Sequence, residues 1–234
     1  MKSPFLAIAL VVMGAVGSAA NADVVHNTVD AFDIINASQG KKTNDAGTAL
    51  VPIVDANRNR VENMFDGSLT TAFSLGLGDT PGNGGSLVLT IKPTTNVIAS
   101  GSLVEWTNLN SGHQESATVS LGVDGGSWEE IGTLKNTQPG NVASFSNLLQ
   151  PYALLSLGSA VNTVHTTFVL TVLSGNFNSL RFQDTSPYLL NGTTKDRDGF
   201  DIANLSVTSV PEPTALALAG AALLVLGAAR RFKA

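Results

Sequence analysis

The chain has 234 residues, of which 13 are Lys or Arg and 18 are Asp or Glu, so its net charge is −5. This acidic balance disfavours nucleic-acid binding, which depends on basic side chains that neutralise phosphates. The absence of cysteine excludes thiol catalysis, thiolate metal sites and a disulfide framework. Residues 23–209, between the two apolar termini, keep nine basic and 17 acidic side chains, a net charge near −8.

The first 22 residues have the organisation of a secretory signal peptide. Lys2 supplies a positive start, residues 5–16 form an apolar run, and Ala20 and Ala22 give a small-x-small cleavage site. Cleavage after Ala22 would leave Asp23 as the new N-terminus. An uncleaved anchor is the alternative, but the run is shorter than the roughly 20 residues that a spanning helix needs. We therefore expect the protein to be exported.

Residues 23–209 alternate apolar and polar side chains in short runs, with turn residues about every ten positions. This pattern predicts one all-β sandwich or barrel domain, long enough to bury its own core. A short helical turn is expected near 59–65, and a mobile polar region at 176–201. The predicted strands are 31–36, 49–54, 86–92, 97–107, 116–123, 128–133, 142–146, 164–173, 179–183 and 202–208.

Three segments in this β region resemble the discoidin-like modules of the galactose-binding fold. Residues 61–74 contain Asp66-Gly67 followed by Thr70-Thr71 and the aromatic Phe73, where the family usually has Trp. Residues 117–132 carry a strand, the turn Asp124-Gly125 and Ser127-Trp128, and residues 179–182 and 203–207 match the last paired strands. The resemblance covers about 61–209 and implies an eight-stranded jelly-roll sandwich, with one or two strands added by 23–60.

The two Asp-Gly pairs predict tight turns, in which the carboxylate accepts a backbone N–H and Gly takes a positive φ. In the discoidin-like family the first turn also holds a structural calcium. The resemblance implies Asp66 and Thr71 as ligands, with Asn204 where an acid is usual and Asp201 close by. The neutral Asn204 weakens such a site, because calcium affinity rises with the number of charged oxygens. A turn without a metal is the alternative.

A second acidic group, Asp196, Asp198 and Asp201, surrounds Gly199. It lacks the twelve-residue spacing and the closing Glu of an EF-hand, so we interpret it as a solvated loop before the last strand.

Trp106 and Trp128 are the aromatic side chains to consider for sugar binding. Trp128 matches a position that is usually core in the resembling family, so we assign it to packing. Trp106 ends a long strand and is the better glycan-binding candidate of the two, but core or half-buried packing is the favoured interpretation for it as well.

The sequence offers little support for catalysis. His26, His113 and His165 are far apart and form no metal-binding spacing. There is no nucleophile elbow and no phosphate-binding loop. Glu129 and Glu130 are adjacent and would face opposite sides of a strand. We therefore expect no enzyme and no certain cofactor.

The last 25 residues contain three blocks in a fixed order. Pro211-Glu212-Pro213 is rigid, residues 214–229 carry no charge, and Arg230-Arg231 begin a basic end. As a helix the 16 uncharged residues would reach about 24 Å, so they span a bilayer only marginally. The basic residues predict that this end stays cytoplasmic and that everything before Pro211 lies outside.

These three blocks resemble the sorting tail of the PEP-CTERM family, whose members are exported by Gram-negative bacteria that carry an exosortase. The resemblance implies a transient stay in the inner membrane, recognition by an exosortase-type enzyme, removal near Pro211 and release to the cell surface or outside the cell. An ordinary C-terminal membrane anchor is the alternative. The domain boundaries expected are 1–22, 23–209 and 210–234.

The sequence thus predicts a non-enzymatic, exported β-sandwich that serves as a structural or adhesive component of the cell surface or the extracellular polysaccharide matrix. A dedicated carbohydrate-binding module is the first alternative and predicts Trp106 exposed beside polar side chains. A secreted polysaccharide hydrolase is the second, and it predicts a cleft holding two carboxylates about 5–10 Å apart.

Overall fold

The computed structural model describes residues 23–106, 114–137, 142–148, 151–161, 165–195 and 197–211. Residues 24–209 form one unit, and only this unit is considered below. It is built almost entirely of strands, as the alternating pattern predicts. Two short 3-10 turns, η1 (Val29–Ala31) and η2 (Val61–Met64), are the helical elements of the described part of the chain, and η2 falls where a helical turn is expected.

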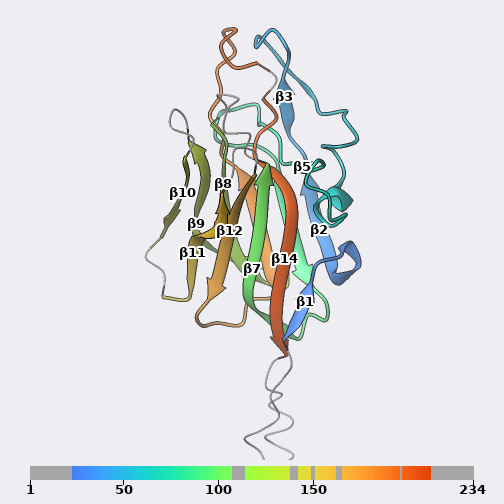
Figure 1. The fold of residues 1–234 in the computed structure, drawn as a ribbon, viewed down its shortest axis with the longest axis vertical. Coiled ribbons are helices and arrows are strands. Elements are labelled where there is room, and N and C mark those ends of the chain that lie inside the picture. Colours follow the sequence, from blue (N-terminus) through green and yellow to red (C-terminus); the bar gives the residue numbers. More distant parts are fainter. Residues whose placement is uncertain are drawn as a thin grey trace, which may run out of the picture. The chain divides into compact units, whose positions relative to one another are not determined.

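Two six-stranded antiparallel sheets make the sandwich (Figure 1). Sheet A has the order β1-β14-β7-β12-β11, and β5 also pairs with β14. Its strands are β1 (Val24–His26), β5 (Phe73–Ser74), β7 (Asn96–Trp106), β11 (Ala153–Val161), β12 (His165–Val172) and β14 (Asp201–Pro211).

Sheet B has the order β10-β9-β8-β13-β6-β2. Its strands are β2 (Phe32–Ser38), β6 (Ser86–Ile91), β8 (Ser116–Val123), β9 (Gly126–Thr137), β10 (Val142–Asn147) and β13 (Ser179–Asp184). A separate two-stranded sheet pairs β3 (Lys41–Thr43) with β4 (Leu50–Pro52).

The predicted strands are confirmed, each within a few residues at its ends. The one or two strands expected from 23–60 are present in the sandwich as β1 and β2, which lie at sheet edges. The eight strands expected in 61–209 are too few, because residues 153–161 add β11 at another edge and the short β5 pairs with β14. The structure also contains β3 and β5, which are too short for an alternating pattern to be visible.

The core lies between the inner faces of the two sheets, where every second side chain of each strand points. Leu103, Phe168 and Leu205 represent sheet A, and Leu89, Val119 and Phe182 represent sheet B; each is at most 4% exposed. The intervening residues of sheet A are half-buried and face outward. This alternation decides which residues share the outer face of sheet A: Asn204 and Ser206 on β14, Trp106 on β7, and His165 on β12.

The two ends of the sandwich differ in what they carry. Val24 pairs with Ser209, so both termini of the domain leave it at one end (Figure 1). At the opposite end β7 finishes with Trp106, while β12 and β14 begin with His165 and Asp201. We call this opposite end the loop end, because the long connections 39–85 and 185–200 gather there.

Candidate functional site

Trp106 is the centre of the candidate site at the loop end. Its indole ring is half-buried on the outer face of sheet A. The guanidinium carbon of Arg58 lies over the ring, 4.0 Å from the ring centroid. His165 is its directly paired residue on β12, and the two rings lie 6.4 Å apart at an angle of 29°. The structure therefore brings an indole, a guanidinium and an imidazole together on one surface.

Arg58 is fixed in place at both its backbone and its side chain. Its carbonyl accepts hydrogen bonds from the Ser74 N–H and from Gln39 Nε2, each 2.9 Å long. Its Nη1 donates to the carboxylates of Asp198 and Asp201. Burial alone would lower the pKa of Arg58, but the two carboxylates outweigh this effect and raise it. The cation over Trp106 is therefore permanently charged and held in one orientation.

The carboxylate of Asp201 lies beneath this cation. Its side chain is 4% exposed, and it also accepts a hydrogen bond from Ser74 Oγ. Burial and the neighbouring Asp198 raise the pKa of Asp201 to about 7, and Arg58 and Ser74 partly counteract that rise. The predicted solvated loop is therefore wrong for Asp198 and Asp201, because both carboxylates turn inward to pair with Arg58. Asp196, the third member, lies outside the described residues.

A second pair of carboxylates lies behind the sheet at the same end. Glu105 and Glu115, 0% and 4% exposed, both accept a hydrogen bond from Nδ2 of Asn136, at 3.0 and 3.1 Å. Burial, together with the charges of Asp201, Asp198 and Glu105, raises the pKa of Glu115 well above its usual value. This layer lies on the core side of sheet A, since Glu105 is buried while Trp106, the next residue, faces outward.

Asp184 ties the connection 185–200 to the loop end. Its carboxylate accepts hydrogen bonds from Ser186 Oγ and from the Phe200 N–H, both 2.7 Å, and it is fully buried. Burial raises its pKa to about 6, even though these hydrogen bonds act in the opposite direction. Arg197 crosses the same connection and donates to the carbonyl of Pro187. This part of the predicted mobile region is therefore anchored by buried polar contacts.

His165 links Trp106 to the segment before β5. Its Nε2 lies 2.6 Å from the carbonyl oxygen of Leu69. Residues 65–69 therefore run along the outer face of sheet A toward β12, two strands away from β14.

A polar depression lies at the other end of that segment. It has a volume of about 430 Å³, within the range of small-molecule sites. One carboxylate, two amides, two hydroxyls, an aromatic ring and a glycine line it. These belong to Asn27, Thr28, Phe65, Asp66, Gly67, Asn204 and Ser206.

The depression contains part of the predicted calcium site. Asp66 and Asn204 both line it, and Thr71 Oγ1 donates to Asp66 Oδ2 over 2.7 Å. Asp201 is not among the lining residues, because it is held by Arg58 and Ser74 instead. Asp66 is thus the only carboxylate lining the depression, and in the described part of the chain no three His, Cys, Asp or Glu side chains group into a metal site. This donor set does not fit a highly charged calcium site, and calcium at Asp66 stays a prediction.

Both Asp-Gly turns form as predicted at the backbone. Gly67 and Gly125 have φ of 73° and 72°, and Asp66 Oδ1 accepts the Ser68 N–H at 2.7 Å. Asp124 differs, because its carboxylate accepts from the side-chain amide of Asn178 at 2.8 Å rather than from a backbone N–H.

Trp128 packs against its own sheet, as its assignment to packing predicts, but it does not lie in the core position that the resemblance implies. It is half-buried and lies over Gly122, where an added Cβ would come within 2.6 Å of the indole ring. Arg181 lies 5.0 Å from its centroid and donates from Nη2 to Ser120 Oγ. The register of β8 and β9 shifts beside Trp128, between Leu121 and Val123, and such shifts change the face on which side chains emerge.

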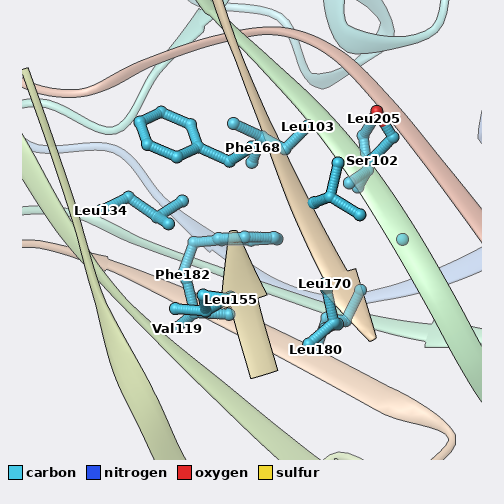
Figure 2. A pocket seen from close by; sticks show the side chains of 12 residues that line it. Ser102, Leu103, Val119, Leu134, Leu155, Phe168, Leu170, Leu180, Phe182 and Leu205 are labelled. Atoms are coloured by element: carbon cyan, nitrogen blue, oxygen red, sulfur yellow. The ribbon is translucent and has the colours of Figure 1, made fainter. Parts of the chain in front are cut away.

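A small cavity also lies inside the core (Figure 2). Its volume is about 20 Å³, close to that of one water probe, and its labelled lining is almost entirely aliphatic or aromatic. Ser102 supplies the one side-chain oxygen in view. A cavity of this size and chemistry has no room for a sugar.

The hydrolase alternative requires two neighbouring carboxylates in a cleft, and the structure has the neighbouring carboxylates. Asp198 and Asp201 approach each other closely enough to share Arg58 Nη1 and Ser74 Oγ. They line neither of the two cavities just described. Their arrangement is that of a buried ion-pair cluster beneath Arg58.

Most processing residues lie outside the described part of the chain. These are Ala20, Ala22, Glu212, Pro213, Arg230 and Arg231. Of the residues at the expected cuts, Asp23 precedes β1 and Pro211 ends β14. Among the described residues, none belongs to a helix long and apolar enough to cross a membrane. The signal peptide and the sorting tail stay predictions.

The sequence singled out Trp106 but missed the groups around it. Arg58 and His165 belong to no recognisable motif in the sequence, and Arg58 is separated from Asp201 by 143 positions. An acid three residues before a strand, as at Asp198, is too common a pattern to have identified this cluster.

No family model and no curated protein matches this chain. Several solved structures are similar over most of it, each at 14% identity. A CBM32 domain of a family 31 glycoside hydrolase from Clostridium perfringens covers 80% of this chain and 95% of its own, with a TM-score of 0.41. The C-terminal domain of a chitobiase from Bacteroides fragilis covers 80% and 98%, with a TM-score of 0.40. The CBM32 domain of AlyQ, in complex with 4,5-unsaturated mannuronic acid, covers 79% and 97%, also at 0.40. Similarity at this level does not assign a function.

Proposed function

We propose that this protein is a carbohydrate-binding β-sandwich that contacts a glycan through Trp106, Arg58 and His165. The observation that carries the proposal is the position of the three side chains on one half-buried surface at the loop end. The proposal follows the carbohydrate-binding alternative of the sequence, with one difference. Trp106 is beside polar groups as that alternative expects, but Arg58 covers part of its ring.

The chemistry of the three groups suits a sugar. An indole presents an apolar surface to the C–H face of a pyranose, and guanidinium nitrogens donate hydrogen bonds to hydroxyl or carboxylate oxygens. The imidazole of His165 lies beside the indole, with its Nε2 held by the Leu69 carbonyl. Asp198 and Asp201 fix Arg58 before any ligand arrives, so little side-chain freedom is lost on binding. Preorganisation of this kind favours specific binding over simple packing.

Affinity electrophoresis tests this proposal. The purified domain would be run through gels containing alginate, polygalacturonate, laminarin or galactomannan, and retardation would be compared with that of Trp106→Ala. We expect at least one polymer to retard the wild type and Trp106→Ala to weaken that binding by about tenfold or more, the equivalent of about 1.4 kcal/mol.

Trp128→Ala is the matched control, because it removes the other indole from the other sheet. It should bind like the wild type. The proposal would be contradicted if the wild type and Trp106→Ala bound equally well, or if no polymer retarded the wild type.

We further propose that the protein acts outside the cytoplasm, at the cell surface or in a polysaccharide matrix, after processing of a signal peptide and a PEP-CTERM tail. The sequence supports this through Ala20 and Ala22 at one end and Pro211 to Pro213 with Arg230 and Arg231 at the other. Intact mass and cell fractionation would compare the wild type with a variant carrying Ala at 211–213. Release of only the wild type, cut near Asp23 and Pro211, is the expected result; retention of both in the membrane with intact tails would contradict it.

A further inference from the structure

We propose that the depression around Asp66 and Asn204 is a second sugar subsite, so that the protein binds an oligosaccharide along the outer face of sheet A. This inference rests on the proposed function, because it extends the Trp106 site to a longer ligand. It concerns a surface that is separate from the Arg58–Trp106–His165 group.

The lining of the depression has the composition of a sugar subsite. Asp66 and Asn204 offer acceptors and donors to hydroxyl groups, and Ser206 and Asn27 add further polar groups. Phe65 contributes an apolar surface and is held by stacking on Phe32, with 5.2 Å between the ring centroids. The volume of about 430 Å³ is within the range of small-molecule sites, and the mostly polar lining offers hydrogen bonds to the hydroxyl groups of a sugar.

Spare hydrogen-bonding capacity remains on Asp66. Its Oδ1 accepts a hydrogen bond from the Ser68 N–H, and its Oδ2 accepts one from Thr71 Oγ1. An ionised carboxylate offers about four lone-pair positions, so a pair of neighbouring hydroxyls could still donate to it. These internal bonds fix its orientation before a ligand arrives.

Two observations place the depression and Trp106 on one continuous face. First, Asn204, Trp106 and His165 are outward-facing residues of neighbouring strands, since sheet A has the order β14-β7-β12. Second, residues 65–69 begin at the depression and reach His165 through the carbonyl of Leu69. A ligand that lies beside this segment would contact both places at once.

Binding measured against ligand length tests the inference. Oligosaccharides of two to six units would be prepared from whichever of the four polymers binds, and their Kd would be determined by calorimetry. We expect the wild type to bind the hexasaccharide about tenfold more tightly than the disaccharide. Asn204→Ala and Asp66→Asn should lose this gain and keep the disaccharide affinity, whereas Trp106→Ala should weaken both.

Thr208→Ala is the matched control, an outward-facing substitution on the same strand but outside the lining. Unfolding temperatures identify any variant that is weakened only because its fold is damaged; Asn204→Ala provides a second test if Asp66→Asn disturbs its turn. Length dependence that survives both substitutions would overturn the inference and leave the Trp106 proposal intact. No binding by the wild type would overturn both. A third outcome would assign the depression to a cation instead. In that case calcium chloride would stabilise the wild type but not Asp66→Asn, and Asn204→Ala would leave the hexasaccharide affinity unchanged.

Discussion

Each sheet of this sandwich carries one tryptophan next to one arginine, and the two pairs are built differently. On sheet A, Arg58 lies 4.0 Å from the Trp106 centroid and is paired with two carboxylates. On sheet B, Arg181 lies 5.0 Å from the Trp128 centroid, binds Ser120, and has a buried Nε with no hydrogen-bond partner among the described residues. The first pair is charge-compensated and held by three chain segments, whereas in the second pair the Trp128 ring lies over Gly122, which has no side chain of its own.

This difference separates a prepared site from surface packing. An aromatic ring beside a cation is found in both places, so the pair alone does not identify a binding site. The buried carboxylates behind Arg58 add a cost in free energy that simple packing does not require, because ionised groups are expensive to desolvate. We infer that the loop end keeps them for orientation, and the sheet B pair shows what the same side chains do without such support.

The largest expected effect is that of Arg58→Ala on stability. The substitution leaves Asp201 buried without its cation, and breaking a buried pair in this way costs about 3–5 kcal/mol. Because the pKa of Asp201 is already raised to about 7, the carboxyl can take up a proton instead, so the loss should be full at pH 8 and clearly smaller at pH 5. Urea unfolding at both pH values measures it.

Arg181→Ala is the counterpart on sheet B. It removes a cation that no carboxylate in the described contacts depends on, so its cost should stay below about 1 kcal/mol and be independent of pH. Equal losses for the two arginine variants would mean that the carboxylates behind Arg58 do not distinguish the pairs.

The wild type should also show a pH-dependent stability set by the loop end. The folded-state pKa of Asp184 is raised from 3.8 to about 6 and that of Asp201 to about 7, so the native state binds more protons than the unfolded chain between about pH 4 and 7. Their contribution is present below pH 4 and is lost as pH rises through 6 to 7. For Asp184 the loss amounts to about 3 kcal/mol at 1.36 kcal/mol per pKa unit.

His26, near the other end, acts in the opposite sense. It is buried against Ser209, and burial lowers its pKa, so its contribution is present above pH 6.5 and is lost as pH falls below that value. The measurement is the free energy of unfolding at half-unit steps from pH 4.5 to 8. His26→Gln should make the fall in stability toward high pH steeper, and a profile that instead rises steadily from pH 4.5 to 8 in this variant would contradict the raised carboxyl pKa values.

The sequence predicted the sandwich well because alternation is a local property. The strand predicted at 116–123 coincides with β8, and the Asp124-Gly125 turn leads directly into β9 as expected. Trp106 was identified for a similar reason, as an aromatic residue at the end of a long strand. Features that depend only on neighbouring residues are visible in the sequence.

The parts that could not be predicted depend on contacts between distant segments. Arg58 reaches Trp106 from a connection without regular structure, and its partner Asp201 comes from the last strand. The core position of Trp128 was implied by the family resemblance, and alternation would not have corrected it, because register shifts between β8 and β9 reverse the side on which side chains point. Neither a bulge nor a distant ion pair leaves a distinct pattern in a single sequence.

The last prediction compares two strand glycines, one in each sheet. Gly122→Ala would place a Cβ 2.6 Å from the Trp128 ring and from the Gly126 carbonyl oxygen, so the ring must move, at a cost of about 1–3 kcal/mol. Gly101, on the strand that carries Trp106, lines the small core cavity, and its added Cβ would meet Ser206 O at 3.5 Å and Leu170 at 3.8 Å, which are ordinary contacts. Gly101→Ala should therefore stabilise the domain by about 0.4–1 kcal/mol, because alanine restricts the unfolded chain and fills the cavity. Thermal unfolding of the two variants measures both effects. If Gly122→Ala were as well tolerated as Gly101→Ala, the Trp128 ring would not lie against Gly122. The distinction between the packed tryptophan of sheet B and the supported tryptophan of sheet A would then lose its basis.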